Sequence, residues 1–286
     1  MFTTDKFVTG QSIDMKDVLI STTRVLTPFT TLLMSKTVRA ENVTLNWIEE
    51  GINELAAVTM PEGGDAPAVV DDTLTPMSNY CELLGATALV SNTSQYTTAT
   101  GWSDLLAHEV AKKTKAMKLK MENVLINGIK NYNVATKTYT TGGILEQIHL
   151  DNQVTNLADF TKIKFEETVS KLYDSGVSDD MICFLPANMK LTLNGFENVD
   201  FLARDFFQGF DTEVYVTPYG RIRFVLEEKL SNKLFIVNPA YLELAELIPF
   251  HGTPEAVSGS KKAIYLETQF GLKLLNSHAA SSFAII

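Results

Sequence analysis

The chain has 286 residues, of which 45% are hydrophobic, so it can bury the core of one large domain or of two modest ones. Its formal net charge of -10 argues against sequence-specific recognition of DNA, because the surface as a whole repels polyanions. Cys81 and Cys183 are far apart and fit neither a zinc site nor a secreted disulfide framework, which predicts two reduced thiols.

Residues 1–42 resemble an arm with too few apolar side chains to fold alone. Ile13, Val18 and Leu19 predict a short amphipathic turn, and we expect Thr27-Pro28-Phe29 to interrupt any helix. Charged residues stand where a signal peptide would be apolar, namely Asp5, Lys6, Asp14, Lys16 and Asp17. No run reaches the roughly 18 apolar residues of a membrane span, so we expect the protein to stay where it is made.

Residues 43–100 predict strands and turns. Val43, Leu45 and Trp47 alternate with polar residues, a second apolar run covers 83–90, and the turn-rich segment 61–67 separates the two. We interpret this region as one long, extended hairpin.

A long helix is predicted from Ser103, as the N-cap, to about Lys130. Apolar residues recur there near every fourth position, namely Leu106, Val110, Met117, Met121 and Leu125. At about 1.5 Å per residue this helix would span roughly 40 Å, and a turn at 141–144 follows it.

The remaining residues predict a mixed α+β region. A helix is expected at 158–174, closed by Gly176, and the apolar strand 181–185 and a short helix through Leu191 follow. A hairpin is expected to turn at 218–220 between strands 213–216 and 221–226, before a strand at 234–237. A last strand pair is expected within 261–275, with an apolar tail at 283–286.

The residues that most often carry chemistry form no motif. His108, His149, His251 and His278 are scattered, so no metal site is predicted. Adjacent acids such as Asp179-Asp180 point to different faces of a helix or strand, which favours solvated surface over catalysis or calcium binding. The glycine pairs at 63–64 and 142–143 lack the spacing of a phosphate loop, and Cys183 lacks a catalytic-thiol signature. The sequence therefore predicts no catalytic residue and no cofactor, although distant residues could still assemble a site.

Charge is segregated in the middle of the chain. No Lys or Arg occurs between Arg39 and Lys112, whereas the long helix carries a basic cluster. One interpretation is two solvated faces, and the other is that the acidic arm of one copy lies on the basic helix of the next. Candidate intersubunit contacts are Glu49, Glu50, Glu62, Asp65, Asp71, Asp72, Lys112, Lys113, Lys115, Lys118 and Lys120. In the second interpretation, exchanging Lys113, Lys115 and Lys118 for Glu blocks or misdirects assembly without unfolding the chain.

An ordered series of such features resembles the Hong-Kong-97-type major capsid proteins of tailed phages, in their short-chain branch. The series covers most of the chain: Thr27-Pro28-Phe29, Trp47, the tip 62–66, Val90-Ser91-Asn92-Thr93, Gly142-Gly143-Ile144, the passage 176–186, Tyr219-Gly220-Arg221-Ile222 and Tyr265-Leu266-Glu267. Each feature is weak alone, and their order is what carries the resemblance.

The resemblance implies an α+β fold of five parts. These are an N-terminal arm at 1–42, an extended E-loop at 43–100, a peripheral domain with its spine helix at 101–159, an axial domain at 160–241, and C-terminal strands returning to the peripheral domain at 242–286. It also implies hexamers and pentamers of an icosahedral or prolate head around double-stranded DNA, assembled in the host cytoplasm. A portal and scaffold or decoration proteins would be partners, and no membrane would be involved.

Some relatives lock the E-loop to a neighbour through a lysine–asparagine bond, but this loop has no lysine, so that cross-link is excluded. Three alternatives stay open at this point: a small enzyme, a nanocompartment shell of the same fold around a protein cargo, and a tail-tube subunit. The last would have no use for a long spine helix.

Overall fold

The computed structural model describes residues 26–53, 56–96, 104–157, 159–177, 180–196, 201–207, 210–256 and 258–285. They fall into two compact units. One unit comprises Gly85–Lys118 and Phe250–Glu267, and the other comprises Leu26–Leu84, Leu119–Pro249 and Thr268–Ile286. The expected amphipathic turn around Val18 and the expected N-cap Ser103 lie outside the described residues.

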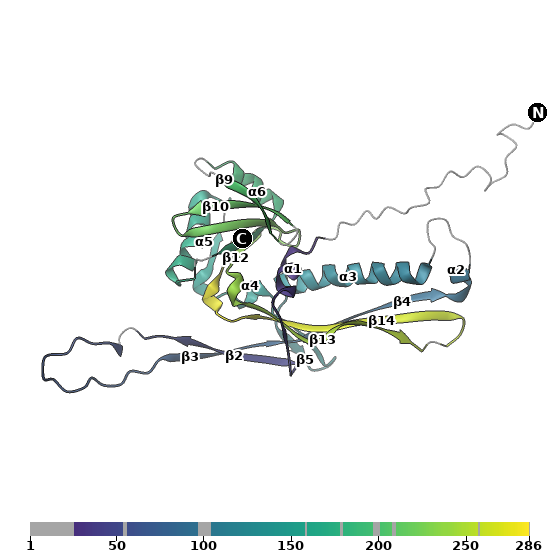
Figure 1. The fold of residues 1–286 in the computed structure, drawn as a ribbon, viewed down its shortest axis with the longest axis horizontal. Coiled ribbons are helices and arrows are strands. Elements are labelled where there is room, and N and C mark those ends of the chain that lie inside the picture. Colours follow the sequence, from purple (N-terminus) through teal and green to yellow (C-terminus); the bar gives the residue numbers. More distant parts are fainter. Residues whose placement is uncertain are drawn as a thin grey trace, which may run out of the picture. The chain divides into compact units, whose positions relative to one another are not determined.

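The helices and strands follow one another in mixed order, as an α+β fold requires (Figure 1). The helices are α1 Pro28–Met34, α2 Asn92–Tyr96, α3 Leu105–Asn127, α4 Ile144–Gln147, α5 Lys162–Asp174 and α6 Ala187–Asn194. The strands are β1 Thr37–Arg39, β2 Thr44–Gly51, β3 Thr73–Tyr80, β4 Glu82–Ser91, β5 Asn131–Asn133, β6 Thr138–Thr140, β7 Gln153–Asn156, β8 Met181–Leu185, β9 Phe201–Phe207, β10 Phe210–Thr217, β11 Gly220–Leu226, β12 Lys233–Val237, β13 Leu242–Glu255, β14 Lys261–Leu274 and β15 Ala280–Ile285.

A seven-stranded sheet organises the larger unit, with the order β7-β15-β12-β8-β11-β10-β9. Its middle strand β8 reads Met-Ile-Cys-Phe-Leu and is buried along its whole length, which fits a strand covered on both faces. β8 pairs in parallel with β11 and antiparallel with β12. The predicted hairpin is confirmed, because β10 and β11 pair antiparallel and Thr217 lies opposite Gly220 across the two-residue turn.

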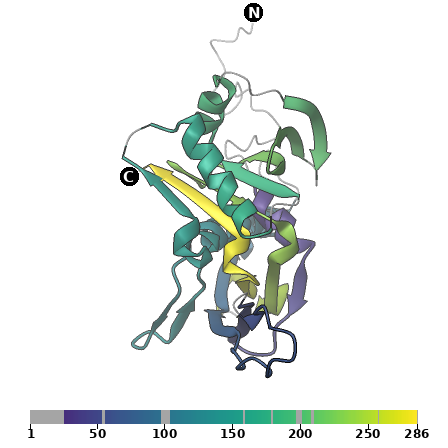
Figure 2. The same ribbon diagram turned by 90° about the vertical axis from the view of Figure 1, so that its left-hand side faces the viewer.

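Helix α5 covers one face of this sheet (Figure 2). Phe165, Val169 and Leu172 recur at helical spacing, and all three are buried in a cluster with residues of β8, β12 and β15. The Thr161 side chain accepts the first-turn N–H of Lys164. Gly176 ends the helix at φ +69°, a left-handed conformation that glycine adopts without strain, as the sequence predicts.

The predicted long helix exists as α3, with 23 residues, and its length is therefore about 35 Å. Asp104 takes the N-cap role, since its Oδ1 accepts the N–H of Ala107 at 3.1 Å. The second half of α3 is apolar on one side, where Met121, Leu125 and Ile126 are buried in the core.

The expectation that Thr27-Pro28-Phe29 interrupts a helix is wrong, because Pro28 begins one. Proline suits the first turn of a helix, where its missing N–H has no intrahelical partner and its fixed φ is already helical. Helix α1 is also not a loose arm, since Phe29, Leu32 and Leu33 are buried in the main core. The Phe29 ring meets those of Phe184 and Phe235 edge-on, each at 5.3 Å between centroids.

The extended hairpin is confirmed, but one of its strands was assigned to the wrong segment. β2 pairs antiparallel with β3 from Thr44 opposite Tyr80 to Gly51 opposite Thr73. The apolar run 83–90, expected to be the returning strand, lies in β4, which belongs to a four-stranded sheet of order β1-β13-β14-β4. The reason is composition: β3 reads Thr-Leu-Thr-Pro-Met-Ser-Asn-Tyr and is mostly exposed, so it lacks the apolar alternation of a half-buried strand.

The C-terminal region also differs from the expectation. Residues 261–274 form the single strand β14 instead of a strand pair, and its partners in the sheet are β13 and β4. The apolar tail forms β15, which lies between β12 and β7 in the larger sheet instead of returning with β13 and β14. Burial explains this place, since residues 280–283 are covered completely or nearly so.

Candidate functional site

Strands β2 and β3 form a two-stranded ribbon (Figure 1). With the connecting segment 52–72 it presents apolar side chains to solvent. Among the described residues, the two strands form a sheet of their own and pair with no further strand. Large apolar side chains that stay exposed here are Ile48, Ile52, Val58, Met60, Val69, Val70 and Leu74. A set of exposed apolar side chains of this kind marks an interaction surface, because two strands alone bury too little to be stable.

The acidic candidates on this ribbon separate into two groups. Glu50, Glu62, Asp65 and Asp71 are exposed, as an intersubunit contact requires. Asp72 is exposed as well, and its Oδ1 accepts the N–H of Asn53 at 3.0 Å. Glu49 points to the other face of β2 and is bound within its own chain.

The basic candidates on α3 do not form one stripe. Lys112, Lys115 and Lys118 recur every three residues and share one side of the helix, whereas Lys113 and Lys120 lie roughly 150° round the helix from Lys115. Lys112 forms an exposed ion pair with Glu109 at 3.5 Å. Lys115 and Lys118 are exposed and make no ion pair within the part of the chain that the structure describes.

Lys120 lies close to Glu82 of the same chain. Burial raises the pKa of the Glu82 carboxyl, while its hydrogen bond from the N–H of Thr141 and the positive charge of Lys120 act in the opposite direction. Lys120 therefore has an electrostatic role within its own subunit.

Asn79, at the end of β3, fixes the hairpin root, which we define as Glu49, Asn79, Thr141, Gly142 and Ser277. The Asn79 side chain is 1% exposed. The two hydrogens of its Nδ2 are shared among three acceptors, Thr141 Oγ1 at 3.1 Å, the Gly142 carbonyl at 2.9 Å and the Leu272 carbonyl at 2.7 Å. Its Oδ1 accepts the N–H groups of Gly142 and Tyr80, so a single side chain joins three segments of one unit.

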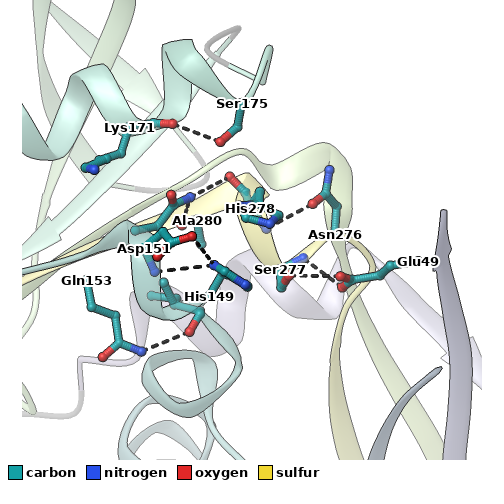
Figure 3. Close-up of polar contacts among 12 residues, drawn as sticks. Glu49, His149, Asp151, Gln153, Lys171, Ser175, Asn276, Ser277, His278 and Ala280 are labelled. Atoms are coloured by element: carbon teal, nitrogen blue, oxygen red, sulfur yellow. Dashed lines mark hydrogen bonds and ion pairs between the residues drawn. The ribbon is translucent and has the colours of Figure 1, made fainter. Parts of the chain in front are cut away.

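Glu49 fixes the root from β2 (Figure 3). Its carboxylate accepts the backbone N–H of Ser277 and the Ser277 hydroxyl, both at 2.8 Å. Ser277 is 4% exposed, so these charge-assisted bonds are partly shielded from water.

Two histidines stack beside this contact. The rings of His149 and His278 are 4.1 Å apart between centroids and tilted by 31°. His149 Nδ1 accepts the N–H of Asp151 and lies 3.5 Å from the Asp151 carboxylate. Partial burial lowers the pKa of His278, and the neighbouring His149 lowers it further, while Glu49 and Asp151 act in the opposite direction. The geometry favours a neutral His278 near neutral pH.

Two open grooves flank the root. One, of about 690 Å³, is lined by Glu49, Glu50, Asp151 and Lys171 among others, and the second, of about 430 Å³, lies beside Asn79 and His149. Among the described residues, no three His, Cys, Asp or Glu side chains are grouped to hold a metal ion.

Burial raises the pKa of Cys81 to about 11 and raises that of Cys183 as well, so both thiols stay protonated at neutral pH.

Sequence reasoning missed the residues that fix the hairpin. Asn79 and Ser277 are single polar residues far from their partners in the sequence, and no local pattern identifies them. The Gly142-Gly143 pair was the one available signal: a Cβ on Gly143 would lie 2.6 Å from the Ile126 carbonyl oxygen, so the backbone must pack closely there.

Comparison with known proteins gives a consistent result. Residues 2–286 match the family model described as SU10 major capsid protein. No curated protein matches the chain. Among solved structures, the capsid of Cyanophage A-1(L) is similar with a TM-score of 0.69 at 12% identity, covering 99% of this chain and 98% of that chain. The capsid of an empty GTA particle has a TM-score of 0.64 at 12% identity, covering 96% and 94%. The SrpI encapsulin complex from Synechococcus elongatus PCC 7942 has a TM-score of 0.59 at 11% identity, covering 93% of this chain and 92% of that chain.

None of the described helices combines the length and the apolar composition that a membrane-spanning helix needs.

Proposed function

This chain belongs to the family of SU10 major capsid proteins, and on that basis we propose that its copies form the hexamers and pentamers of an icosahedral or prolate phage head around double-stranded DNA. The family membership makes it a structural capsid component of Hong-Kong-97-type fold that assembles with itself. The number and arrangement of copies, the DNA, and assembly in the host cytoplasm belong to the proposal.

The observation that carries the proposal is the ribbon of β2 and β3. Seven large apolar side chains stay exposed among its described residues, two on the strands and five on the connecting segment. A second copy of the chain would cover them, and many modest contacts per subunit then add up in a closed shell. Acidic residues beside the apolar ones make the docking specific, because positive charge on the neighbour favours one docking position over others.

We propose that the exposed carboxylates of this ribbon meet the lysines of α3 in the next copy. The basic side consists mainly of Lys115 and Lys118, and Lys112 lies on the same side of the helix. The acidic side comprises Glu50, Glu62, Asp65, Asp71 and Asp72. Glu49 is hydrogen-bonded to Ser277 of its own chain, and Lys120 interacts electrostatically with Glu82 of its own chain. We therefore assign neither of them to docking.

Deletion of the connecting segment tests the proposal. The full chain is expected to form closed shells in electron micrographs. A variant in which a short Gly-Ser linker replaces residues 52–72 should keep the circular dichroism spectrum of the full chain, because none of the described residues in this segment is buried. It should not form shells. A full chain that stays a single copy at every concentration and salt, or a shortened chain that forms the same shells, contradicts the proposal.

Two neighbouring proposals follow from the family. A portal and scaffold or decoration proteins would be the further partners, and the chain would act without catalysis, so that purified protein shows no hydrolytic activity. The encapsulin likeness shows a shared fold and supports a nanocompartment less than the family match supports a phage head. Shells isolated from the native source would contain DNA in a phage head and protein in a nanocompartment.

A further inference from the structure

Two carboxyl groups are buried together at the base of α1. Glu122 on α3 is 0% exposed, and Glu227, which follows β11, is 1% exposed. Both lie in the larger unit. Burying two carboxylates side by side is unfavourable unless one of them holds a proton, because like charges repel strongly where water is excluded.

Glu122 acts as the missing N-cap of α1. The side chain of the N-cap residue Thr27 makes no capping hydrogen bond. Instead, the two oxygens of Glu122 accept the N–H of Phe29 at 2.8 Å and that of Thr30 at 2.7 Å, and the Thr30 hydroxyl donates to the same carboxylate. Three donors on one carboxylate favour its acceptor form, so Glu122 holds α1 through its negative charge.

Glu227 supplies the proton of the pair. Its Oε1 accepts the N–H of Lys229 at 2.9 Å, and its buried Oε2 receives no hydrogen bond from the residues that the structure describes. Burial and then the neighbouring Glu122 raise the pKa of Glu227 to about 9. A protonated Oε2 becomes a donor toward Glu122, whereas an ionised one would be an unpaired charge in the core.

Few other charges of the described residues act on Glu227. Helix α1 has no titratable side chain, and Lys229 is the cation that acts on Glu227. The surrounding core is apolar, with Phe29, Leu125, Phe184, Leu230 and Phe235 in one cluster.

We propose that Glu122 and Glu227 share one proton and so form a lock that fastens α1 to α3, which opens when rising pH removes the proton. The lock fixes the point at which residues 1–25 join the described part of the chain, because α1 begins at Pro28. It lies within one copy, so its test does not depend on shell assembly.

The direction of the pH effect follows from linkage. In the open form Glu227 has its ordinary pKa of 4.5, and in the closed form its pKa is about 9. Between these values the closed form keeps a proton that the open form has lost, so opening becomes easier as pH rises. The equilibrium constant for opening therefore rises by up to about tenfold per pH unit. The rise ends near pH 9, where the closed form also loses the proton.

Hydrogen exchange of the α1 amides, followed by mass spectrometry on the full chain, measures this equilibrium. We expect the protection of residues 29–34, corrected for intrinsic exchange, to fall between pH 6 and pH 9 in the unaltered chain. Glu227→Gln keeps a neutral donor and should hold protection constant over this range. Glu228→Gln removes the same charge at the exposed neighbouring position and should retain the fall.

Glu122→Gln is the second variant, because an amide can accept with only one of its two terminal atoms. It should lower α1 protection at every pH and remove most of the pH dependence. The proposal is overturned if Glu227→Gln and Glu228→Gln show the same fall as the unaltered chain, or if Glu122→Gln leaves α1 protection unchanged. Should Glu227→Gln fail to fold, the Glu122→Gln result decides alone.

Discussion

Glu49 of β2 accepts two hydrogen bonds from Ser277, a residue 228 positions later in the chain. The next residue, Glu50, points to the opposite face of the strand and is exposed. Two adjacent acids thus have different roles: one fixes the base of the projecting ribbon, and the other is available to a neighbouring copy. The direction of the ribbon depends on the first of them.

Glu49→Ala should loosen the ribbon without unfolding the larger unit. It removes the acceptor of two charge-assisted hydrogen bonds and leaves the Ser277 donors unpaired, which costs about 2 kcal/mol in unfolding free energy. Denaturant unfolding measures the cost, and hydrogen exchange of β2 and β3 should increase. The matched control is Glu50→Ala, which removes the same charge from the exposed face and should leave both quantities nearly unchanged. Equal effects of the two variants would mean that the Glu49 contact has no role in stability.

Asn79→Ala should be more damaging than Glu49→Ala. The Asn79 side chain has five hydrogen-bond partners at 1% exposure, and its loss leaves the Gly142 N–H without its side-chain acceptor and the Leu272 carbonyl with only the longer 3.3 Å bond from Gln147. We expect a loss of about 3 kcal/mol or more in unfolding free energy, measured by thermal or denaturant unfolding. Asn46→Ala on the exposed side of β2 is the control and should cost little. A similar small loss in both variants would contradict the role assigned to Asn79.

The sequence was sufficient for elements whose pattern is local. Helix α3 and strand β8 follow from apolar spacing, and the end of α5 follows from Gly176. β3 was missed because its exposed Thr, Pro and Ser residues have no apolar alternation. The partner of β4 was missed because β14 is remote in the sequence, and strand pairing between remote segments is fixed by packing of the whole unit.

The same limit applies to the candidate site. Segregation of acids and lysines was visible in the sequence, but the division of roles between Glu49 and Glu50 depends on which face meets Ser277. Likewise, five lysines in nine positions resemble one cluster, whereas helix geometry separates Lys115 and Lys118 from Lys113. Glu122 has no sequence signal, and Glu227 stands beside Glu228 in one of the adjacent acid pairs expected to be solvated surface; that expectation is wrong for Glu227, which is 1% exposed.

Acidification should weaken the hairpin root through His278. Its pKa is lowered in the folded chain, mainly by burial, so the unfolded chain takes up a proton first as pH falls. The stability that depends on neutral His278 is therefore fully present above its ordinary pKa of 6.5 and is lost as pH falls below that value. The charged groups beside it are His149, Glu49 and Asp151, with Lys171 and Asp174 on the same groove.

Thermal midpoints measured from pH 8 to pH 5 check this effect. Because carboxylates also respond to acid, the informative quantity is the difference between the unaltered chain and His278→Gln. That difference should be constant above about pH 6.5 and should change below it in favour of the variant. His251→Gln removes a histidine from the ion pair with Glu267 and should not reproduce this change. A difference curve that stays flat down to pH 5 would exclude His278 as the sensitive group.

Charge exchange provides the sharpest check on docking between copies. The triple exchange of Lys113, Lys115 and Lys118 for Glu reverses charge on two sides of α3. The more specific variant is the double exchange Lys115→Glu with Lys118→Glu, which reverses charge on one side only. This double variant should stay folded, because both side chains are exposed, and should fail to form shells at low salt. Lys113→Glu with Lys120→Glu changes the total charge equally on another side of the helix and should disturb assembly less.

The reciprocal exchange then identifies the partner surface. Adding Glu62→Lys and Asp65→Lys to the Lys115→Glu, Lys118→Glu chain restores opposite signs between ribbon and helix, so shells should reappear, as counted in electron micrographs. The ribbon variants alone should assemble poorly. Shells from Lys115→Glu, Lys118→Glu at low salt would remove the charge-pairing hypothesis outright. If the ribbon variants, the helix variants and the combined chain all fail to form shells, the lysines lie opposite a different surface of the neighbour.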